Sequence, residues 1–301
     1  MKVLVSDGIA PEGAKMMEEA GLEVVQQKYS PEELLANIAD FDAILVRSAT
    51  KVPKEVIDAG KKLKAIARGG VGLDNIDTAY AKEKGIPVLN TPGASSISVA
   101  ELAIGHMLAA CRFLNRSNVE MLEGKWPKKD YKAGIELTGK TLGLLGIGNI
   151  GKETAKRGIG MGMTVIAYDP FIKEVDIDVE MVSKDDLLAR ADFISLHIPF
   201  IKAEGPALGD AEFAKMKDGV VLVNCARGGT VKESALLDAL NSGKVARAGI
   251  DVWETEPAGE NQKALIHHPN VSVTPHIGAS TNEAQIRVGT EIAEKIINTL
   301  K

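Results

Sequence analysis

The hydrophobic positions of this chain fall into short apolar runs separated by amphipathic stretches. In the first 90 residues the apolar runs are KVLVS, LEVVQQ, DAILVRS, LKAIARG and IPVLN, at residues 2–6, 22–27, 42–48, 63–69 and 86–90. Between them lie stretches with helical spacing, several of which open with Pro or close with Gly, at residues 11–21, 31–38, 53–62 and 76–85. This alternation predicts a parallel sheet covered by helices on both faces.

A second alternation begins at Thr141, after a long helical pattern over residues 95–124. Its apolar runs lie at residues 141–151, 163–169, 192–199, 219–229, 245–252 and 270–278, and an amphipathic helix is predicted at 281–300. Residues 100–111 of the long helix are almost all apolar or small, which predicts burial. With 301 residues, the pattern predicts an α/β protein with two consecutive parallel-sheet domains.

Composition and charge narrow the classes of function. The net charge is -5 and no basic run is denser than GKWPKK at residues 124–129, so a nucleic-acid partner is not expected. The N-terminus has no signal-like apolar segment, and no run approaches the roughly 18 apolar residues of a membrane span, so we expect a cytoplasmic protein with no membrane partner. Cys111 and Cys225 have no metal-ligand spacing, which predicts reduced, buried thiols and no bound metal.

A glycine loop opens the second alternation. Gly146, Gly148 and Gly151 form G-x-G-x-x-G between a predicted strand and a predicted helix, the context in which this motif binds a dinucleotide. The helix would start at Asn149 and direct free N–H groups at a pyrophosphate. Asp169 ends the next strand, where its carboxylate can bind ribose hydroxyls and repel a 2′-phosphate. The loop therefore predicts NAD as cofactor, rather than NADP.

Four chemically distinctive residues follow later strands: Arg227, Asp251, Glu256 and His276. Each alone has an ordinary structural interpretation, and a lone histidine in a loop is more often satisfied by its neighbours than catalytic. Together, at the carboxyl ends of strands on a dinucleotide-binding scaffold, they fit the oxidation of a hydroxy acid. His276 would take the hydroxyl proton, Glu256 would orient it, and Arg227 would hold the carboxylate with a fork of donors.

The motifs GKTLGLLGIGNIGKETA, VNCARGGTVKESALLDAL, AGIDVWETEP and TPHIGAST resemble those of the D-isomer-specific 2-hydroxyacid dehydrogenases. LVRSATKV, ARGGVGLDNID and LNTPGASSISVAELAIGHMLA resemble the phosphoglycerate dehydrogenase branch of that family, and the resemblance runs almost end to end. It implies two Rossmann-like or flavodoxin-like parallel-sheet domains separated by an active-site cleft. The substrate-binding domain would be discontinuous, comprising residues 1–94 and 283–301, with the NAD-binding Rossmann domain at 95–282.

The resemblance also implies roles for single residues. Arg227, Glu256 and His276 take the family's catalytic roles, and Asp251 matches the aspartate that holds the nicotinamide. Further cofactor contacts are implied at Ile150, His197, Pro199, Cys225, Ala226 and Gly278. Where the family usually continues from SLHIP with Leu-Thr, this chain has Phe200-Ile201, so a hydroxyl near the cofactor is missing.

The expected reaction is the NAD-dependent oxidation of D-3-phosphoglycerate to 3-phosphohydroxypyruvate, the first step of serine biosynthesis. Arg47 and Arg68 follow strands of the first domain and match family positions near the substrate phosphate. One alternative is a reductase of glyoxylate, hydroxypyruvate or another small 2-keto acid; another is an NADH-sensing co-repressor that binds peptides. The family implies a homodimer or higher oligomer, in which the region of Lys125–Lys132 either approaches the partner's site or is simply solvated. No C-terminal serine-binding domain is expected, because the sequence stops after its last helix.

Overall fold

A computed structural model describes all residues from 1 to 301, and the chain divides into two compact units. One unit comprises residues 1–96 and 279–301, and the other comprises residues 97–278. Each unit is built on a sheet in which all neighbouring strands are parallel. This confirms the predicted fold class of two parallel-sheet α/β domains.

The first unit has a five-stranded sheet in the order β2-β1-β3-β4-β5, which is the order of flavodoxin-like folds. Its strands are β1 Lys2–Val5, β2 Glu23–Gln26, β3 Ala43–Val46, β4 Ala65–Arg68 and β5 Val88–Leu89. Its helices are α1 Pro11–Glu19, α2 Pro31–Asn37, the 3-10 helix η1 Ile38–Asp40, α3 Lys54–Ala59, α4 Thr78–Glu83 and α12 Asn282–Leu300.

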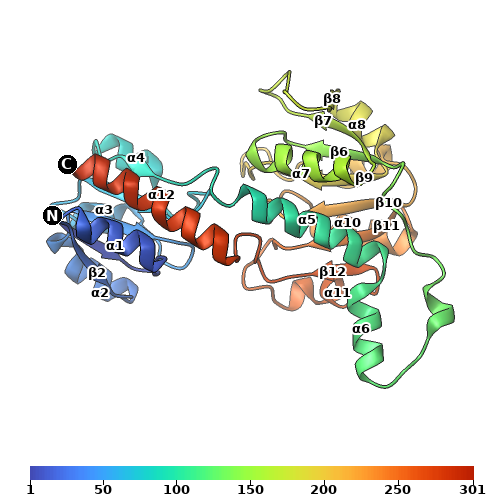
Figure 1. The fold of residues 1–301 in the computed structure, drawn as a ribbon, viewed down its shortest axis with the longest axis horizontal. Helices are drawn as coiled ribbons and strands as arrows, with labels where there is room; N and C mark the ends of the chain where they lie inside the picture. Colours follow the sequence, from blue (N-terminus) through green and yellow to red (C-terminus); the bar gives the residue numbers. More distant parts are fainter. The chain divides into compact units, whose positions relative to one another are not determined.

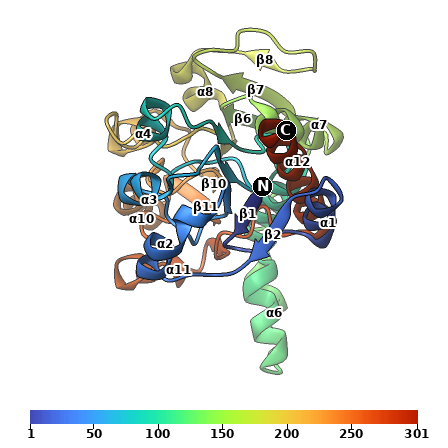
Figure 2. The ribbon, with the colours of Figure 1, turned by 90° about the vertical axis from the view of Figure 1, so that its left-hand side faces the viewer.

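Helix α12 brings the end of the chain back to the first sheet, where it lies beside α1 (Figures 1 and 2). The two helices come very close, since a Cβ on Gly13 would lie 2.4 Å from the carbonyl oxygen of Gly289. Ile292 and Ile296 of α12 pack with Val3 and Leu45 in the core on that face of the sheet. A separate cluster on α2, α3 and α4 covers the other face.

The second unit has a seven-stranded sheet in the order β12-β11-β10-β9-β6-β7-β8. Its strands are β6 Thr141–Leu145, β7 Thr164–Tyr168, β8 Glu180–Met181, β9 Phe193–Leu196, β10 Val220–Asn224, β11 Val245–Ile250 and β12 Val271–Val273. Its helices are α5 Ser96–Cys111, α6 Leu114–Leu122, η2 Lys128–Tyr131, α7 Asn149–Gly160, α8 Lys184–Arg190, α9 Asp210–Lys215, α10 Glu233–Ser242, η3 Glu260–Gln262 and α11 Lys263–Ile266. Because the order of strands reverses between β6 and β9, the ends of these two strands form the switch point at which such sheets bind ligands.

The single helix predicted over residues 95–124 was wrong, because the structure has two helices that meet at 63°. Phe113 between them has a left-handed backbone, with φ of 56°, which interrupts the helical hydrogen bonds. Its ring lies 5.4 Å from the ring of Tyr131 and beneath the Arg247 guanidinium. Helix α6 then projects from the second unit with no buried residue (Figure 2).

The apolar segment of α5 is buried as predicted, with Ala103, Met107 and Cys111 inaccessible to solvent. Cys111 and Cys225 are both free, buried thiols, which confirms that prediction. Across the chain, no single helix is both long and apolar enough to cross a membrane, and only the bent pair α5 and α6 would reach that length together.

Candidate active site

The glycine loop between β6 and α7 has a different requirement at each glycine. Gly146 has φ of 94°, and a Cβ there would lie 2.5 Å from the carbonyl oxygen of His197. A Cβ on Gly151 would lie 2.3 Å from the carbonyl oxygen of Gly146, so this glycine permits α7 to pack against the turn. Around Gly148 no atom lies within 4 Å of a Cβ position, so its open side can admit a ligand. Helix α7 begins directly after it, at Asn149, followed by the half-buried Ile150.

Asp169 follows β7 and binds the backbone of two loops. Its Oδ2 accepts from Ile147 N at 3.1 Å, and its Oδ1 accepts from Phe171 N at 2.9 Å and Ile172 N at 3.1 Å. Burial opposes ionisation, but these three N–H groups and the charge of Lys173 together outweigh it and hold the pKa of Asp169 below its ordinary value. A carboxylate has about four acceptor positions, so this charged group keeps room for a further donor.

At the end of β9, His197 has few polar partners. Its Nε2 lies 3.1 Å from Ser195 Oγ, and its Nδ1 is buried with no hydrogen-bond partner. Burial lowers the pKa of His197 to about 3. Pro199 beyond it is exposed, and the ring of Phe200 lies against Gly229, only 3.0 Å from where a Cβ on that glycine would be. Phe200, where the family usually has leucine, thus packs its ring against the turn that carries Arg227.

Arg227 lies in a tight turn after β10. Asn224, the last residue of β10, organises this turn: its Oδ1 accepts from Ala226 N at 3.1 Å, and its Nδ2 donates to the Arg227 carbonyl at 3.2 Å. Gly228 is required because a Cβ there would lie 1.8 Å from the Trp253 carbonyl oxygen. Cys225 is buried, which raises the pKa of its thiol well above the ordinary value and makes it an unreactive packing group. The Arg227 side chain is half-buried and donates Nη1 to the Ala226 carbonyl.

The structure brings His276 and Glu256 together as the sequence predicted. His276 Nδ1 lies 2.7 Å from Glu256 Oε2, and the two side chains are 45% and 37% exposed. The hydrogen bond to Glu256 raises the pKa of His276, and burial opposes this less strongly. Burial raises the pKa of Glu256, but the bond and charge of His276, the amide of Trp253 and the charge of Arg227 together outweigh it, so the net shift is downward. The charge of Arg227 acts on both groups, so the three residues form one electrostatic cluster.

His276 is also one of only two non-glycine residues with a positive φ, at 57°. Such a backbone needs support from its surroundings, and Asp251 supplies it. The Asp251 carbonyl accepts from His276 N at 2.8 Å, while its carboxylate accepts from Ile277 N at 2.8 Å and Gly278 N at 2.9 Å. Asp251 is 1% exposed, so in this structure it holds the histidine loop. Its implied contact with the nicotinamide stays a prediction.

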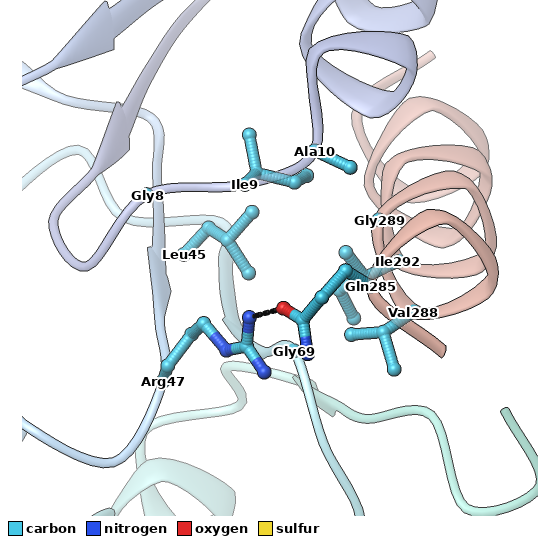
Figure 3. Close-up of a pocket in the computed structure, with 10 residues that line it drawn as sticks. All are labelled: Gly8, Ile9, Ala10, Leu45, Arg47, Gly69, Gln285, Val288, Gly289 and Ile292. Carbon is cyan, nitrogen blue, oxygen red and sulfur yellow. Dashed lines mark hydrogen bonds between the residues drawn. The ribbon is translucent and has the colours of Figure 1, made fainter. Parts of the chain in front are cut away.

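Arg47 lies in the first unit and reaches α12 (Figure 3). Its Nη1 donates to Gln285 Oε1, and Gln285 in turn donates to the Ala279 carbonyl at 2.7 Å. Burial lowers the pKa of Arg47, though not enough to remove its charge. Together with Gly8, Ile9, Leu45, Gly69 and Ile292, these side chains line a cavity of about 10 Å³, room for about one water molecule.

Arg68 ends β4 of the same sheet, and its Nη1 lies 3.7 Å from Asp74 Oδ2. Its side chain is 14% exposed, against 71% for Asp74. The neighbouring backbone of Arg47 is fixed independently, since Asp7 Oδ2 accepts from Arg47 N and Asn75 Nδ2 donates to the Arg47 carbonyl, both at 2.7 Å. The two arginines thus lie at the carboxyl ends of adjacent strands, Arg47 just after β3 and Arg68 at the end of β4.

Sequence reasoning missed the residues that support the site: Asn224, Thr274 and Gln285. Asn224 and Thr274 are polar residues at or just beyond the end of a strand, which was the one available sign of them. Gln285 is an ordinary polar position of an amphipathic helix and gave no sign. The lysines from Lys125 to Lys132 are exposed, in a segment that contains the short helix η2. No group of three or more His, Cys, Asp or Glu side chains is arranged to hold a metal ion.

Comparison with known proteins places this geometry in a family. Residues 104–278 match the model of the D-isomer specific 2-hydroxyacid dehydrogenase, NAD binding domain. The chain is 53% identical to a hydroxypyruvate reductase of Thermotoga maritima, over 99% of this chain and 98% of that protein. It is 48% identical to a D-3-phosphoglycerate dehydrogenase of Archaeoglobus fulgidus, over the whole chain but only 58% of that protein. Among solved structures, a D-lactate dehydrogenase of Aquifex aeolicus complexed with NAD and lactic acid has a TM-score of 0.83 and 30% identity, over 98% of this chain and 94% of that one.

Proposed function

The chain belongs to the D-isomer-specific 2-hydroxyacid dehydrogenases, with NAD as cofactor, and we propose that it oxidises D-3-phosphoglycerate to 3-phosphohydroxypyruvate. The observation that carries the chemistry is the hydrogen bond of 2.7 Å between His276 and Glu256, beside the charge of Arg227. The relatives that carry the substrate assignment are D-3-phosphoglycerate dehydrogenases at 43% to 48% identity, of whose length the chain spans 56% to 58%.

His276 is the proposed acid-base residue. With Nδ1–H donated to Glu256, the lone pair of Nε2 is left to accept the substrate's hydroxyl proton. Bound NAD would accept the hydride from the carbon that carries this hydroxyl. As the C–H and O–H bonds break, the carbonyl double bond forms, and the carboxylate of Glu256 stabilises the resulting imidazolium. In the reverse direction the imidazolium returns the proton.

Arg227 is the proposed carboxylate-binding residue, because a guanidinium presents two parallel donors to a carboxylate. Asn224 and Gly228 fix the turn, so the backbone from which the Arg227 side chain extends is held in place.

Asp169 and the glycine loop fit NAD: Gly148 leaves open space beside the N-terminus of α7, and Asp169 is charged. Ile150, Ala226 and Gly278 are proposed as further cofactor contacts from the family resemblance.

Arg47 and Arg68 are the proposed recognition elements for the substrate phosphate. A phosphate binds several donors at once, and each guanidinium has five N–H groups. The bond from Arg47 to Gln285 uses one donor direction of that fork. Glycerate and lactate lack the phosphate, so these arginines would distinguish phosphoglycerate from them.

A second candidate is the reduction of hydroxypyruvate, favoured by the 53% identity to a hydroxypyruvate reductase of nearly equal length. The two functions share the hydride transfer and differ in the phosphate.

We also propose a cytoplasmic homodimer acting in serine biosynthesis. The dimer is supported by the exposed apolar side chains of the α6 region, which are Leu114, Val119, Met121, Leu122 and Trp126; light scattering after gel filtration tests it.

The experiment that tests the substrate is a comparison of kcat/KM for D-3-phosphoglycerate and D-glycerate with NAD, and for phosphohydroxypyruvate and hydroxypyruvate with NADH. Charge-assisted contacts to the phosphate are worth about 1.5 to 3 kcal/mol, so we expect the phosphorylated substrates to be preferred by about tenfold to a hundredfold. Equal or better turnover of hydroxypyruvate would replace phosphoglycerate by the second candidate. Absence of turnover with all four would favour a binding protein.

A further inference from the structure

A line of polar side chains leads from the exposed Asn115 to the buried residues under the loop that carries His276. His106 of α5 is 2% exposed; its Nδ1 lies 2.9 Å from Ser272 Oγ and its Nε2 lies 2.9 Å from Thr274 Oγ1. Asn115 Nδ2 donates to Ser272 Oγ at 2.9 Å, and Thr274 Oγ1 donates to Asp251 Oδ1 at 2.6 Å. The five side chains form one continuous chain of hydrogen bonds within the second unit, from Asn115 to Asp251.

The carboxylate at one end of this hydrogen-bonded series fixes the direction of the bonds nearest to it. The carboxylate of Asp251 can only accept, so Thr274 gives its proton to Asp251 and must accept from His106 Nε2–H. At the other end, the amide of Asn115 donates to Ser272, which leaves the proton of Ser272 free to go to His106 Nδ1. Nε2 of His106 therefore carries a proton, and with Nδ1 accepting from Ser272 the ring is a neutral imidazole. Burial lowers the pKa of His106, and the charge of Asp251 opposes this, so the net shift favours the same neutral form.

The position of the ring depends on a glycine in the sheet. A Cβ on Gly249, in β11, would lie 2.5 Å from His106 Cβ and 3.0 Å from Cγ. Any larger residue at 249 would push the imidazole away from Ser272 and Thr274. The site for His106 is thus built by the backbone of β11 as well as by its hydrogen-bond partners.

The series of hydrogen bonds ends at Asp251, the residue that holds the histidine loop. Asp251 accepts from the amides of Ile277 and Gly278, and its carbonyl accepts from His276 N, whose φ is 57°. A shift of Thr274 or Asp251 therefore moves His276 relative to Glu256. We propose that His106 is a positioning residue for this reaction: through Thr274 and Asp251 it holds the loop in which His276 meets Glu256. This inference rests on the proposed role of His276 as the acid-base residue.

The test uses four variants of the full chain. Thr274→Val keeps the shape of the side chain and removes the central hydroxyl, Thr274→Ser restores it, and His106→Leu removes both ring bonds. Thr154→Val is the matched control, because Thr154 is a fully buried threonine of α7 that donates to the Ile150 carbonyl outside this chain of bonds. Small misplacement of a reacting group costs up to about a hundredfold in rate.

For Thr274→Val and His106→Leu we expect kcat to fall about tenfold to a hundredfold, with NAD affinity within twofold of wild type. The pH midpoint of kcat/KM should also move down, because a displaced His276 loses part of its bond to Glu256. Thr274→Ser should restore both quantities, and Thr154→Val should change neither. If folded Thr274→Val keeps the wild-type kcat and pH midpoint and loses only thermal stability, His106 is structural and the proposal fails.

A second measurement does not use activity. In the ¹⁵N spectrum of the histidine rings, the signals that disappear in His106→Leu belong to His106. In the wild type, these signals should be those of a neutral ring protonated at Nε2. A ring protonated at Nδ1 would overturn the proposed bond direction. Should His106→Leu fail to fold, the Thr274→Val and Thr274→Ser pair decides the positioning role. Normal turnover by His276→Gln would instead overturn the proposed function, while leaving the tautomer result intact.

Discussion

The residues at strand ends in the two units are held in very different ways. In the second unit, Asp251 makes two bonds to the amides of the histidine loop, Glu256 accepts from Trp253 N as well as binding His276, and a Cβ on Gly228 would overlap the Trp253 carbonyl. In the first unit, the Arg47 backbone is equally well fixed, but its guanidinium is bonded to the end of another long side chain, the amide of Gln285. Arg68 reaches an exposed carboxylate at 3.7 Å.

This difference separates what is fixed from what can vary. The backbone contacts around His276 admit few substitutions, so we expect the geometry of this loop to stay the same whatever the substrate. Long side chains such as those of Arg47, Arg68 and Gln285 can be re-aimed by one substitution. That fits the comparisons, in which hydroxypyruvate reductase and D-3-phosphoglycerate dehydrogenase are both close in sequence to this chain.

The largest effect is expected at the rigid end of this comparison. His276→Gln should lower kcat by about two to four orders of magnitude, the usual contribution of a positioned acid-base group. The fold and NADH affinity should be retained, because glutamine can still bind Glu256 and keeps the backbone amide that donates to Asp251. Steady-state kinetics with NADH titration measures both quantities. His267→Gln is the control, since His267 is exposed and bonds only the Lys263 carbonyl; a folded His276→Gln that turns over like this control would make the loop histidine a structural residue.

At the flexible end, Arg47→Lys should reduce the preference for phosphoglycerate over glycerate by about tenfold. Lysine keeps the charge but loses the planar fork, and a charge-assisted hydrogen bond is worth about 1.5 to 3 kcal/mol. D-Glycerate serves as the control within the same protein, because its kcat/KM should hardly change. Arg68→Lys is expected to act in the same direction. An unchanged preference in both variants would remove the physical basis for the phosphate assignment.

The two parallel sheets were predictable because each follows from local patterns, but the return of α12 to the first unit was not, since the pattern alone predicted two consecutive domains. Apolar runs such as AILV at β3 and VVLVN at β10 are buried on both sides, and the glycines mark where helices end. The break at Phe113 was not, because exposed apolar residues such as Leu114 and Met121 continue the helical spacing. At the break, Phe113 contacts Tyr131 and Arg247, which are distant in sequence, and the helical spacing carries no sign of such contacts.

The candidate site divides in the same manner. His276, Glu256 and Arg227 were predictable, since each is a chemically distinctive residue just beyond an apolar strand. Their supports were not. His106 lies inside an apolar helix and Thr274 in a β-branched run, and the bond between them joins residues 168 positions apart. Hydrogen bonds of this kind are set by the tertiary structure and leave no periodic trace in the sequence.

A smaller effect distinguishes a glycine kept for packing from one kept for a ligand. Gly148→Ala should leave the free energy of unfolding within about 0.5 kcal/mol of wild type, because its φ of -67° suits alanine and the space around it is open. The new methyl group should nevertheless raise the Kd for NAD about tenfold, or ~1.4 kcal/mol. Gly151→Ala should instead destabilise the fold, since its Cβ would lie 2.3 Å from the Gly146 carbonyl oxygen. Urea unfolding and NAD titration separate the two cases, and Gly160→Ala, an open position at the end of α7, is the control.

The finest distinction concerns the charge of Glu256. Its bond raises the pKa of His276 above the ordinary 6.5. Oxidation needs the neutral imidazole, so the rate with NAD should rise with pH through this raised pKa. Reduction needs the imidazolium, so the rate with NADH should fall through the same pKa.

Glu256→Gln keeps a hydrogen-bond acceptor for Nδ1–H but removes the negative charge, which lowers the pKa of His276 toward 6.5. The pH profiles of both reactions should therefore move to lower pH. At mildly acidic pH, oxidation should reach a larger fraction of its maximal rate, and at neutral pH, reduction should reach a smaller fraction. Profiles of kcat/KM in both directions measure this shift, with Glu254→Gln as control because Glu254 bonds the Glu233 amide and not the histidine. A midpoint that stays in place, or moves in opposite directions for the two reactions, would mean that another group titrates in the rate and that Glu256 only orients the ring.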